Sequence, residues 1–519
     1  MKLFNTKSAL AALLLAVTVT SCDIDDFGDI NQSPNQPSTA YTSMLFTYSA
    51  TFVRNFTMTS YEYDPWMQMR TGYIAESKNN QYGDLDTTVS FNTTNYYRHA
   101  IKNLNTIIEM NEDPETNSET NVVEFGDNAN QIAAAKTLRA FYYMTMTDIL
   151  GPIPYSEAFK GESDDIWAPK LDSQESIYAA LDADLRQAYS QFNEAGSLTA
   201  ADIFFGGDIS KWKKFNATIR EMMAIKMAEV APTEGQSRFA QAYSDGAMET
   251  NDDSFSYTFD TKISTTPYAW FYYIGNLGYS GRGLGFAPNK IFVDALKEYK
   301  DPRTFTYLTI GSDAYLGARP GDPADFDSYI GIELGLENND AVNVQRGVAC
   351  SVAAKYCEPT ATYGLITAAR TKLVEAEAAT LGWINADANA LYQEGISLSF
   401  EEQGAAGLDE YLVSEKVVLS SDKETALKQI VMQRFLAGFL TDGIESWSDW
   451  RRYDIPSMPM GPQQLLSNHT VYPYRMEYYS DDYAVNEANI QSAVQQYLGG
   501  SDDRWSRVWW DVKDNVPQN

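Results

Sequence analysis

The sequence predicts a mainly α-helical fold, in which degenerate tetratricopeptide-like helical hairpins pack with long irregular loop segments. Two observations support this prediction. Apolar residues recur at helical spacing in many short stretches, and turn residues separate these stretches. The 519 residues are also 44% hydrophobic and 21% charged, which is apolar enough for a folded body. No clean repeat period occurs, so the hairpins are expected to be degenerate and not a regular array.

Amphipathic periodicity predicts helices at 96–110, 131–150, 176–192, 212–227, 363–383, 388–400 and 424–440. Gly151-Pro152 predicts the end of the helix at 131–150, because glycine caps a helix in the left-handed region and proline cannot continue it. Asp172, with Glu175 three residues later, predicts a start of the capping-box type for the helix that follows.

Three stretches lack helical periodicity and are rich in Tyr, Gly, Asn, Asp and Pro, at 60–95, 230–350 and 455–519. Loops of this length are uncommon unless they carry function, so we expect the binding surface there. No composition typical of a linker occurs after residue 40. The sequence therefore predicts that residues 41–519 form a single domain.

The first residues have the features of an export signal. Residues 1–21 contain two lysines and then an apolar stretch that ends in small residues before Cys22. Such a segment predicts a signal peptide and is too short to span a membrane. The sequence Val19-Thr20-Ser21-Cys22 resembles a bacterial lipobox, which implies lipidation of Cys22. Residues 22–40, which are acidic and then rich in Pro and Asn, are interpreted as a tether.

The charge balance excludes several partners. There are 39 Lys and Arg against 70 Asp and Glu, a formal net charge of −31. Nucleic acid and anionic lipid both need a basic face, so neither is an expected partner. With two histidines and no nucleophile or phosphate-binding motif, the sequence predicts no metal, no cofactor and no catalytic residue. Glycoside hydrolysis needs two suitably placed carboxylates, and it stays open as a minor alternative.

Two cysteines remain beyond the leader. Cys350 and Cys357 lie in a chain expected to face an oxidising compartment. A local disulfide between them and two unlinked thiols are equally compatible with the sequence. Neither cysteine is expected to be catalytic.

A series of motifs, taken in order, resembles the SusD/RagB family of outer-membrane nutrient-binding lipoproteins of Bacteroidetes, in its SusD-like branch. Each fragment is weak alone, but their order and spacing are specific. The fragments, besides the leader and Cys22, are Asp29-Ile30-Asn31, Pro34-Asn35-Gln36-Pro37, 149–158, 212–220, Asp301-Pro302-Arg303, 329–332, 373–378, 443–452, 486–489 and 508–511.

The resemblance implies a helical, non-enzymatic protein, lipid-anchored and surface-exposed on the outer membrane. It would bind an oligosaccharide and deliver it to a SusC-like TonB-dependent transporter. A RagB-like peptide-binding protein is the alternative. The resemblance also implies mostly structural roles for its motifs: Glu445, Trp447, Asp449 and Arg451-Arg452 would form a buried or semi-buried ion-pair and packing cluster, and Trp509-Trp510 would dock the tail.

Ligand contacts are expected from the variable loops, where aromatic rings stack on sugars and Arg donates hydrogen bonds to hydroxyls. The predicted contacts are Trp66, Arg70, Tyr73, Tyr82, Trp270, Tyr272, Tyr273 and Arg282.

Overall fold

A computed structural model describes residues 39–56, 64–76, 90–259, 286–310, 312–313, 317–318, 321–336, 348–358, 360–461 and 471–512. Residues Thr42–Asn519 form one compact unit, and Met1–Tyr41 form a separate one. The predicted signal peptide, Cys22 and nearly all of the predicted tether lie outside the described residues.

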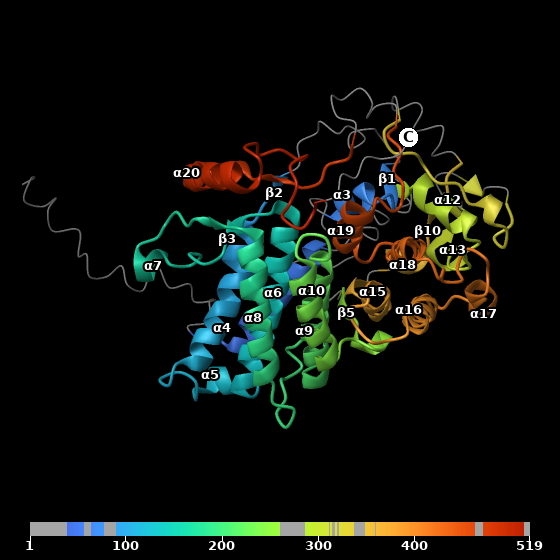
Figure 1. Ribbon diagram of the computed structural model, residues 1–519. Coiled ribbons are helices and arrows are strands. Elements are labelled where there is room, and N and C mark those ends of the chain that lie inside the picture. Colours follow the sequence, from blue (N-terminus) through green and yellow to red (C-terminus); the bar gives the residue numbers. More distant parts are fainter. Residues whose placement is uncertain are drawn as a thin grey trace, which may run out of the picture. The chain divides into compact units, whose positions relative to one another are not determined.

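Helices dominate the described residues, which confirms the predicted mainly α fold (Figure 1). The α-helices are α2 (Thr42–Thr51), α3 (Asp64–Arg70), α4 (Lys102–Glu112), α5 (Thr120–Val123), α6 (Asn128–Leu150), α7 (Gly161–Asp164), α8 (Gln174–Gln191), α9 (Ile209–Lys226), α10 (Pro232–Asp245), α12 (Lys290–Glu298), α13 (Thr304–Tyr307), α15 (Ala368–Leu381), α16 (Ala388–Gln403), α17 (Leu408–Leu412), α18 (Lys423–Ala437), α19 (Gly443–Tyr453) and α20 (Ser480–Tyr497). The short 3₁₀ or π turns are η2 (Phe52–Phe56), η3 (Tyr96–Ile101), η4 (Asn251–Asp253), η6 (Phe326–Ser328) and η7 (Ala354–Cys357).

Successive helices pack against one another as hairpins. Helix α6 lies between α4 and α8, α9 packs against α8 and α10, and α15 packs against both α16 and α18 (Figure 1). Contact between α9 and α15 joins the two groups of helices. Each helix buries its apolar face against helices that are near it in the chain. This confirms the predicted hairpin arrangement, in which the hairpins do not form a regular repeat.

Several predicted boundaries need correction. The cap of α8 is Ser173, whose side chain accepts the Ser176 N–H, while Asp172 instead accepts the backbone N–H of Ser156 at 2.7 Å. The segment 362–366 is strand β11, and α15 begins only at Ala368. The region 455–519, predicted to be irregular, contains the 18-residue helix α20. The sequence did not predict this helix because polar residues interrupt its apolar spacing.

Strands are short and occur in pairs. They are β1 (Ile74–Glu76), β2 (Ser90–Phe91), β3 (Ile153–Pro154), β4 (Leu171–Asp172), β5 (Phe255–Thr258), β6 (Phe286–Pro288), β7 (Leu308–Thr309), β8 (Ser312–Asp313), β9 (Gly317–Ala318), β10 (Ser351–Val352), β11 (Thr362–Ile366) and β12 (Glu477–Tyr478). Two pairs position the site described below. Antiparallel β3 and β4 close a loop over residues 155–170, and parallel β2 and β12 bring α20 beside the start of η3.

A buried ionic cluster ties the C-terminal helices to the hairpins, as the resemblance implied. Lys226 on α9 places its Nζ 2.7 Å from Asp148 and 2.8 Å from Glu445. Arg452 lies 2.6 Å from Glu377, and Arg434 reaches the same carboxylate at 2.6 Å. Such groups are expensive to bury alone, so their mutual pairing specifies how α6, α9, α15, α18 and α19 meet.

Trp510 confirms the expected docking of the tail. Its indole is 1% exposed and donates to Asp148 Oδ1 at 2.8 Å. The guanidinium of Arg451 lies between two rings, 3.9 Å from the Trp447 centroid and 4.4 Å from that of Trp510. The segment around Trp510 is therefore held by stacking and by the Asp148 carboxylate.

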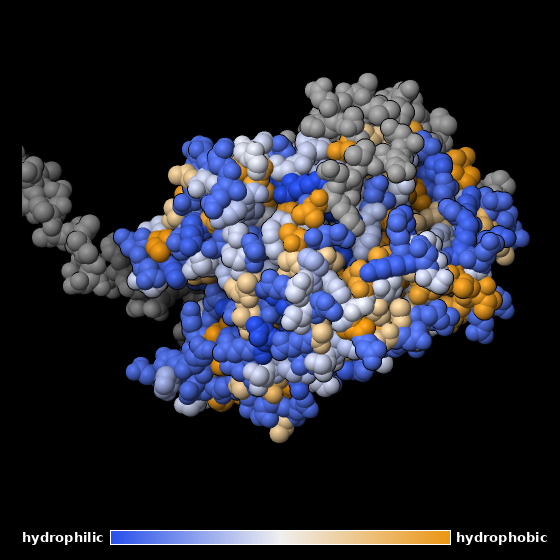
Figure 2. Space-filling view, viewed as in Figure 1, coloured by the Kyte–Doolittle hydropathy of each residue, from blue (hydrophilic) through white to orange (hydrophobic). Residues whose placement is uncertain are grey.

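Hydrophilic residues predominate on the face shown in Figure 2, where apolar residues form small separate groups. Within the described residues, every helix is too short or too polar to cross a bilayer.

Candidate functional site

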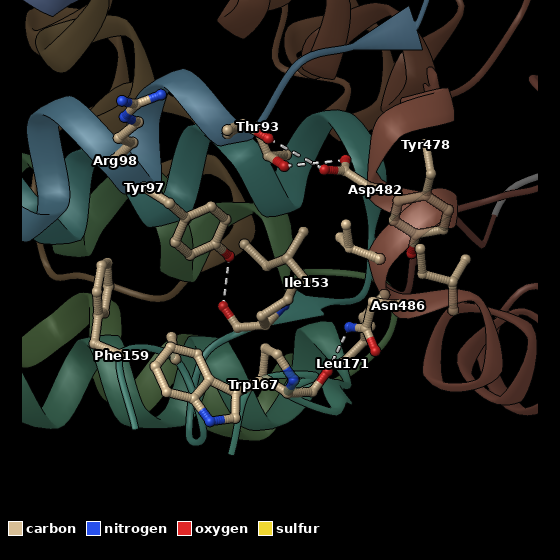
Figure 3. Close-up of a pocket in the computed structure, with 16 residues that line it drawn as sticks. Thr93, Tyr97, Arg98, Ile153, Phe159, Trp167, Leu171, Tyr478, Asp482 and Asn486 are labelled. Atoms are coloured by element: carbon tan, nitrogen blue, oxygen red, sulfur yellow. Dashed lines mark hydrogen bonds between the residues drawn. The ribbon is translucent and has the colours of Figure 1, made fainter. Parts of the chain in front are cut away.

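An apolar pocket of about 310 Å³ lies between the 155–170 loop, the start of η3 and helix α20 (Figure 3). Three separate parts of the chain therefore form its walls. The lining residues are Thr93, Thr94, Tyr97, Arg98, Ile153, Pro154, Ala158, Phe159, Trp167, Pro169, Leu171, Tyr478, Asp482, Val485, Asn486 and Ile490.

Aromatic rings form one side of the pocket. Tyr97 and Phe159 have ring centroids 6.0 Å apart, and Trp167 lies close by on the same loop as Phe159 (Figure 3). Trp167 is 72% exposed and Phe159 is 41% exposed. Large rings left this open to solvent, beside a concavity, are typical of a binding surface.

The loop that carries these rings has an unusual backbone. Phe159 (φ 64°) and Asp165 (φ 57°) both adopt the left-handed region, which disfavours residues other than glycine. Trp167 lies so close to Gly161 that a Cβ there would be 2.9 Å from its ring carbons. The Trp167 indole donates to Asp165 Oδ1 at 2.8 Å. Together these contacts fix the orientation of an exposed ring, and such local strain is common at functional sites.

Helix α20 holds the same loop from the opposite side. Asn486 donates its side-chain N–H to the Pro169 carbonyl at 2.7 Å, and Asn489 donates to the Ala168 carbonyl at 2.8 Å. Asn486 has φ −145°, so α20 is kinked at this residue. The two amides therefore anchor the chain immediately after Trp167.

Polar groups gather at the rim. Asp482 accepts hydrogen bonds from the hydroxyls of Thr93 at 3.2 Å and Thr94 at 3.3 Å. Burial raises the pKa of Asp482, and these two hydrogen bonds only partly offset it. Arg98 is exposed at the edge, and its side chain forms no hydrogen bond or ion pair with the residues that the structure describes.

The interior is apolar because its hydroxyls serve the fold. Tyr97 donates to the Pro154 carbonyl at 2.5 Å, and Tyr478 donates to the Pro152 carbonyl at 2.6 Å. Burial raises the pKa of both phenols, so both stay protonated and keep donating at ordinary pH. Ile153, Leu171 and Ile490 supply the rest of the inner surface.

This arrangement suits binding better than hydrolysis. Asp482 is the one carboxylate among the lining residues, whereas glycoside hydrolysis uses two that face the scissile bond. No group of three or more His, Cys, Asp or Glu able to hold a metal occurs within the part of the chain that the structure describes.

A second hollow, of about 560 Å³, has a different character. It lies beside α12 and is lined by the acidic residues Asp294, Glu298 and Glu333, with Tyr472 as its one ring among the described residues. The Tyr472 side chain is 2% exposed, so it offers little surface for stacking. The pocket beside Trp167 is therefore the better candidate for a sugar.

None of the predicted ligand contacts is among the described residues that line this pocket. Tyr82, Trp270, Tyr272, Tyr273 and Arg282 lie outside the described residues, and so does the side chain of Trp66, whose backbone belongs to α3.

Arg70 and Tyr73 are described, and both lie in the interior. Tyr73 is fully buried and its hydroxyl donates to the Phe435 carbonyl at 2.8 Å, while Arg70 is 5% exposed. Burial lowers the pKa of Arg70 to about 9. Both side chains are therefore buried, and the ligand contacts predicted for them stay predictions.

The cysteine prediction remains open. Cys350 is 2% exposed, in a segment next to β10, and the side chain of Cys357 lies outside what the structure describes. The local disulfide between them stays a prediction.

The sequence predictions covered part of the pocket. The stretches 60–95 and 455–519, where the binding surface was expected, contain the lining residues Thr93, Thr94, Tyr478, Asp482, Val485, Asn486 and Ile490, but none of these was named as a ligand contact. Tyr97 was expected only as part of an amphipathic helix, and the loop 155–170 lay outside the expected binding stretches. One signal was present: Trp167 sits among Asp164, Asp165 and Pro169, a polar setting that is unusual for a buried indole.

Paired helical hairpins, short strand pairs and an open aromatic pocket define a helical binding protein. A family model described as starch-binding, associating with outer membrane, and named SusD-like, matches residues 34–479. The chain belongs to this SusD-like family. The predicted resemblance is thereby confirmed, and the family's members are outer-membrane-associated binding proteins. A comparison with curated proteins found no match.

Solved structures agree with this assignment. A chitin-binding protein is 25% identical, with a TM-score of 0.73 over 91% of this chain and 100% of its own. A SusD homolog from Bacteroides fragilis is 21% identical, with a TM-score of 0.75 over 91% of this chain and 100% of its own. A chitin-binding SusD homolog from Flavobacterium johnsoniae is 22% identical, with a TM-score of 0.73 and coverages of 91% and 99%.

Proposed function

We propose that this protein captures an oligosaccharide at the cell surface and passes it to a SusC-like TonB-dependent transporter, without cleaving it. Lipidation at Cys22 would hold it on the outer membrane. The observation that carries the proposal is the open pocket beside Trp167 in a SusD-like chain. The names of similar proteins, which include starch-binding and chitin-binding ones, support a glycan as ligand.

The chemistry of the pocket supports the same ligand class. Sugar rings present C–H faces that stack on Trp and Tyr, while their hydroxyls need donors and acceptors at the edge. Trp167 and Phe159 provide the stacking surface, and Asp482 and Arg98 lie at the rim. The acidic surface does not hinder this binding, because most such ligands are uncharged.

Isothermal titration calorimetry of the purified protein against a panel of neutral oligosaccharides tests the proposal. Trp167→Ala should weaken binding of the preferred glycan about two- to tenfold, since stacking on one ring contributes about 0.5–1.5 kcal/mol. Val413→Ala is the control, because Val413, which directly follows α17, is 74% exposed and does not line the pocket. Binding of peptides and of no glycan would favour the peptide-binding alternative instead.

Three further measurements test the remaining parts. Release of new reducing ends from a bound glycan would contradict a purely binding role. Cys22→Ala should move the protein from the membrane fraction to the soluble fraction. Co-purification of the anchored protein with a TonB-dependent transporter would support delivery, and its absence under mild detergent would count against it.

A further inference from the structure

The inner side chains of the pocket beside Trp167 offer no free hydrogen-bonding group to a ligand hydroxyl. Tyr97 and Tyr478 are the inner residues with hydroxyl groups, and both donate to backbone carbonyls of the β3 segment. The other inner residues, Ile153, Leu171 and Ile490, carry hydrocarbon side chains. A sugar hydroxyl placed there would lose its hydrogen bonds to water and gain few in return.

The rim is different, since hydrogen-bonding groups are concentrated there. Asp482 uses two of its lone pairs on Thr93 and Thr94, and a carboxylate has about four. Arg98 and Asn486 also line the pocket, on different sides of it (Figure 3), and the side-chain oxygen of Asn486 accepts a hydrogen bond from Asn489 at 2.8 Å. A ligand that fits would therefore have one apolar group for the interior and several polar groups for the rim.

We propose that the pocket takes an N-acetylated sugar residue, with the methyl of the acetamido group in the apolar interior and the sugar ring against Trp167. This inference rests on the proposed glycan-binding function and adds the class of sugar. The acetamido methyl can fill the apolar interior without losing a hydrogen bond, whereas a hydroxyl in the same place would lose its hydrogen bonds to water. The ring hydroxyls stay at the rim near Asp482 and Arg98.

Two trisaccharides isolate the acetamido group. Triacetylchitotriose and cellotriose share a backbone of β-1,4-linked glucose-type rings and differ at C2, where one carries acetamido and the other hydroxyl. Calorimetry on the whole mature protein should give affinity about tenfold or more higher for triacetylchitotriose. Equal affinities, or a preference for cellotriose, would overturn the inference.

A variant that fills the pocket locates the binding. Ala158 lines the pocket and is half-buried, so Ala158→Leu adds carbon atoms to the interior without a large change in the core. It should abolish the preference for triacetylchitotriose. Ala484→Leu is the matched control, because Ala484 is an exposed residue of α20 that does not line the pocket.

The outcomes separate this inference from the proposed function. If other glycans bind in a Trp167-dependent manner while the acetamido group confers no advantage, the sugar class is wrong and glycan capture stands. If no glycan binds at all, both fail. If triacetylchitotriose binds equally well to Ala158→Leu, the sugar lies at another site and the inference is wrong.

Discussion

The Nζ of Lys226 lies 2.8 Å from Glu445 Oε1, although 219 residues separate them in the chain. Lys226 also reaches Asp148 at 2.7 Å, and all three side chains are nearly inaccessible to solvent. Helices α9, α6 and α19 therefore meet at one buried cation. A buried charge that loses its partner destabilises a fold strongly, so this contact is a sensitive test of the architecture.

Lys226→Met should lower the free energy of unfolding by about 3–5 kcal/mol, because it leaves two carboxylates facing each other in the interior. Urea unfolding followed by circular dichroism measures the loss. Lys416→Met is the control, since the Lys416–Glu298 pair is exposed at 50% and 61% and should contribute at most about 1 kcal/mol. Similar losses in both variants would contradict the structural role of Lys226.

Glu377 should make the fold sensitive to acid. Burial alone would raise its pKa, but Arg452 and Arg434 outweigh burial and lower the pKa from 4.5 to about 2. A lowered pKa in the folded state adds stability above pH 4.5, and this stability is lost as the pH falls toward 2. The contribution is about 3 kcal/mol by linkage.

Glu377→Gln should therefore be much less stable than the natural protein at pH 7, and the gap should narrow as the pH falls from 4.5 toward 2. Unfolding measured across this range checks the trend. Glu424→Gln provides a comparison, because Glu424 is 79% exposed in its pair with Lys428. A gap that is constant with pH would show that the carboxylate charge is not what stabilises this contact.

Glu221 should give the stability of the fold the opposite dependence on pH. It is fully buried and accepts no hydrogen bond from the described residues, so burial, reinforced by Glu375, raises its pKa well above 4.5. Burial also raises the pKa of Glu375 to about 7, despite Lys372 at 2.9 Å. The folded protein keeps protons that the unfolded chain releases, so stability present below pH 4.5 declines as the pH rises.

Glu221→Gln should flatten this decline, with a gain in stability at pH 8 of about 1–3 kcal/mol and little change at pH 5. Urea unfolding at pH 5, 6.5 and 8 measures it. Glu175→Gln, at an exposed position of α8, should leave the profile unchanged. A loss of stability at pH 8 in Glu221→Gln would mean that the buried carboxylate is ionised and paired.

The two amides on α20 should control ligand affinity through Trp167. Each hydrogen bond to the 168–169 carbonyls contributes about 1 kcal/mol to holding the loop. The double variant Asn486→Ala, Asn489→Ala should weaken glycan binding about tenfold, with little change in the unfolding midpoint. Calorimetry and thermal unfolding measure the two effects. Gln491→Ala, an exposed contact on the same helix, should leave affinity unchanged.

The sequence pattern was sufficient to predict elements whose formation depends on neighbouring residues in the chain. The helix ending at Leu150, its stop at Gly151 (φ 83°), and helices α9 and α16 follow from apolar spacing and turn residues within one stretch of chain. The Arg451-Arg452 cluster was predicted only as part of a family resemblance. Its actual partners, such as Glu377 and the Asp148 carbonyl, could not be chosen from 70 acidic residues or from spacing alone.

The sequence alone determined the class of fold and the family, because both depend on residues that are close together or on the order of motifs along the chain. It also predicts the leader with Cys22, which stays a prediction. Tertiary structure alone decided that Tyr73 is interior and that Trp167, Tyr97 and Asn486 surround one pocket. Those residues meet because the β2–β12 pair joins segments nearly 400 residues apart (Ser90 to Glu477). The physical reason is that a concave surface depends on which distant side chains remain uncovered after packing, and no local pattern encodes that.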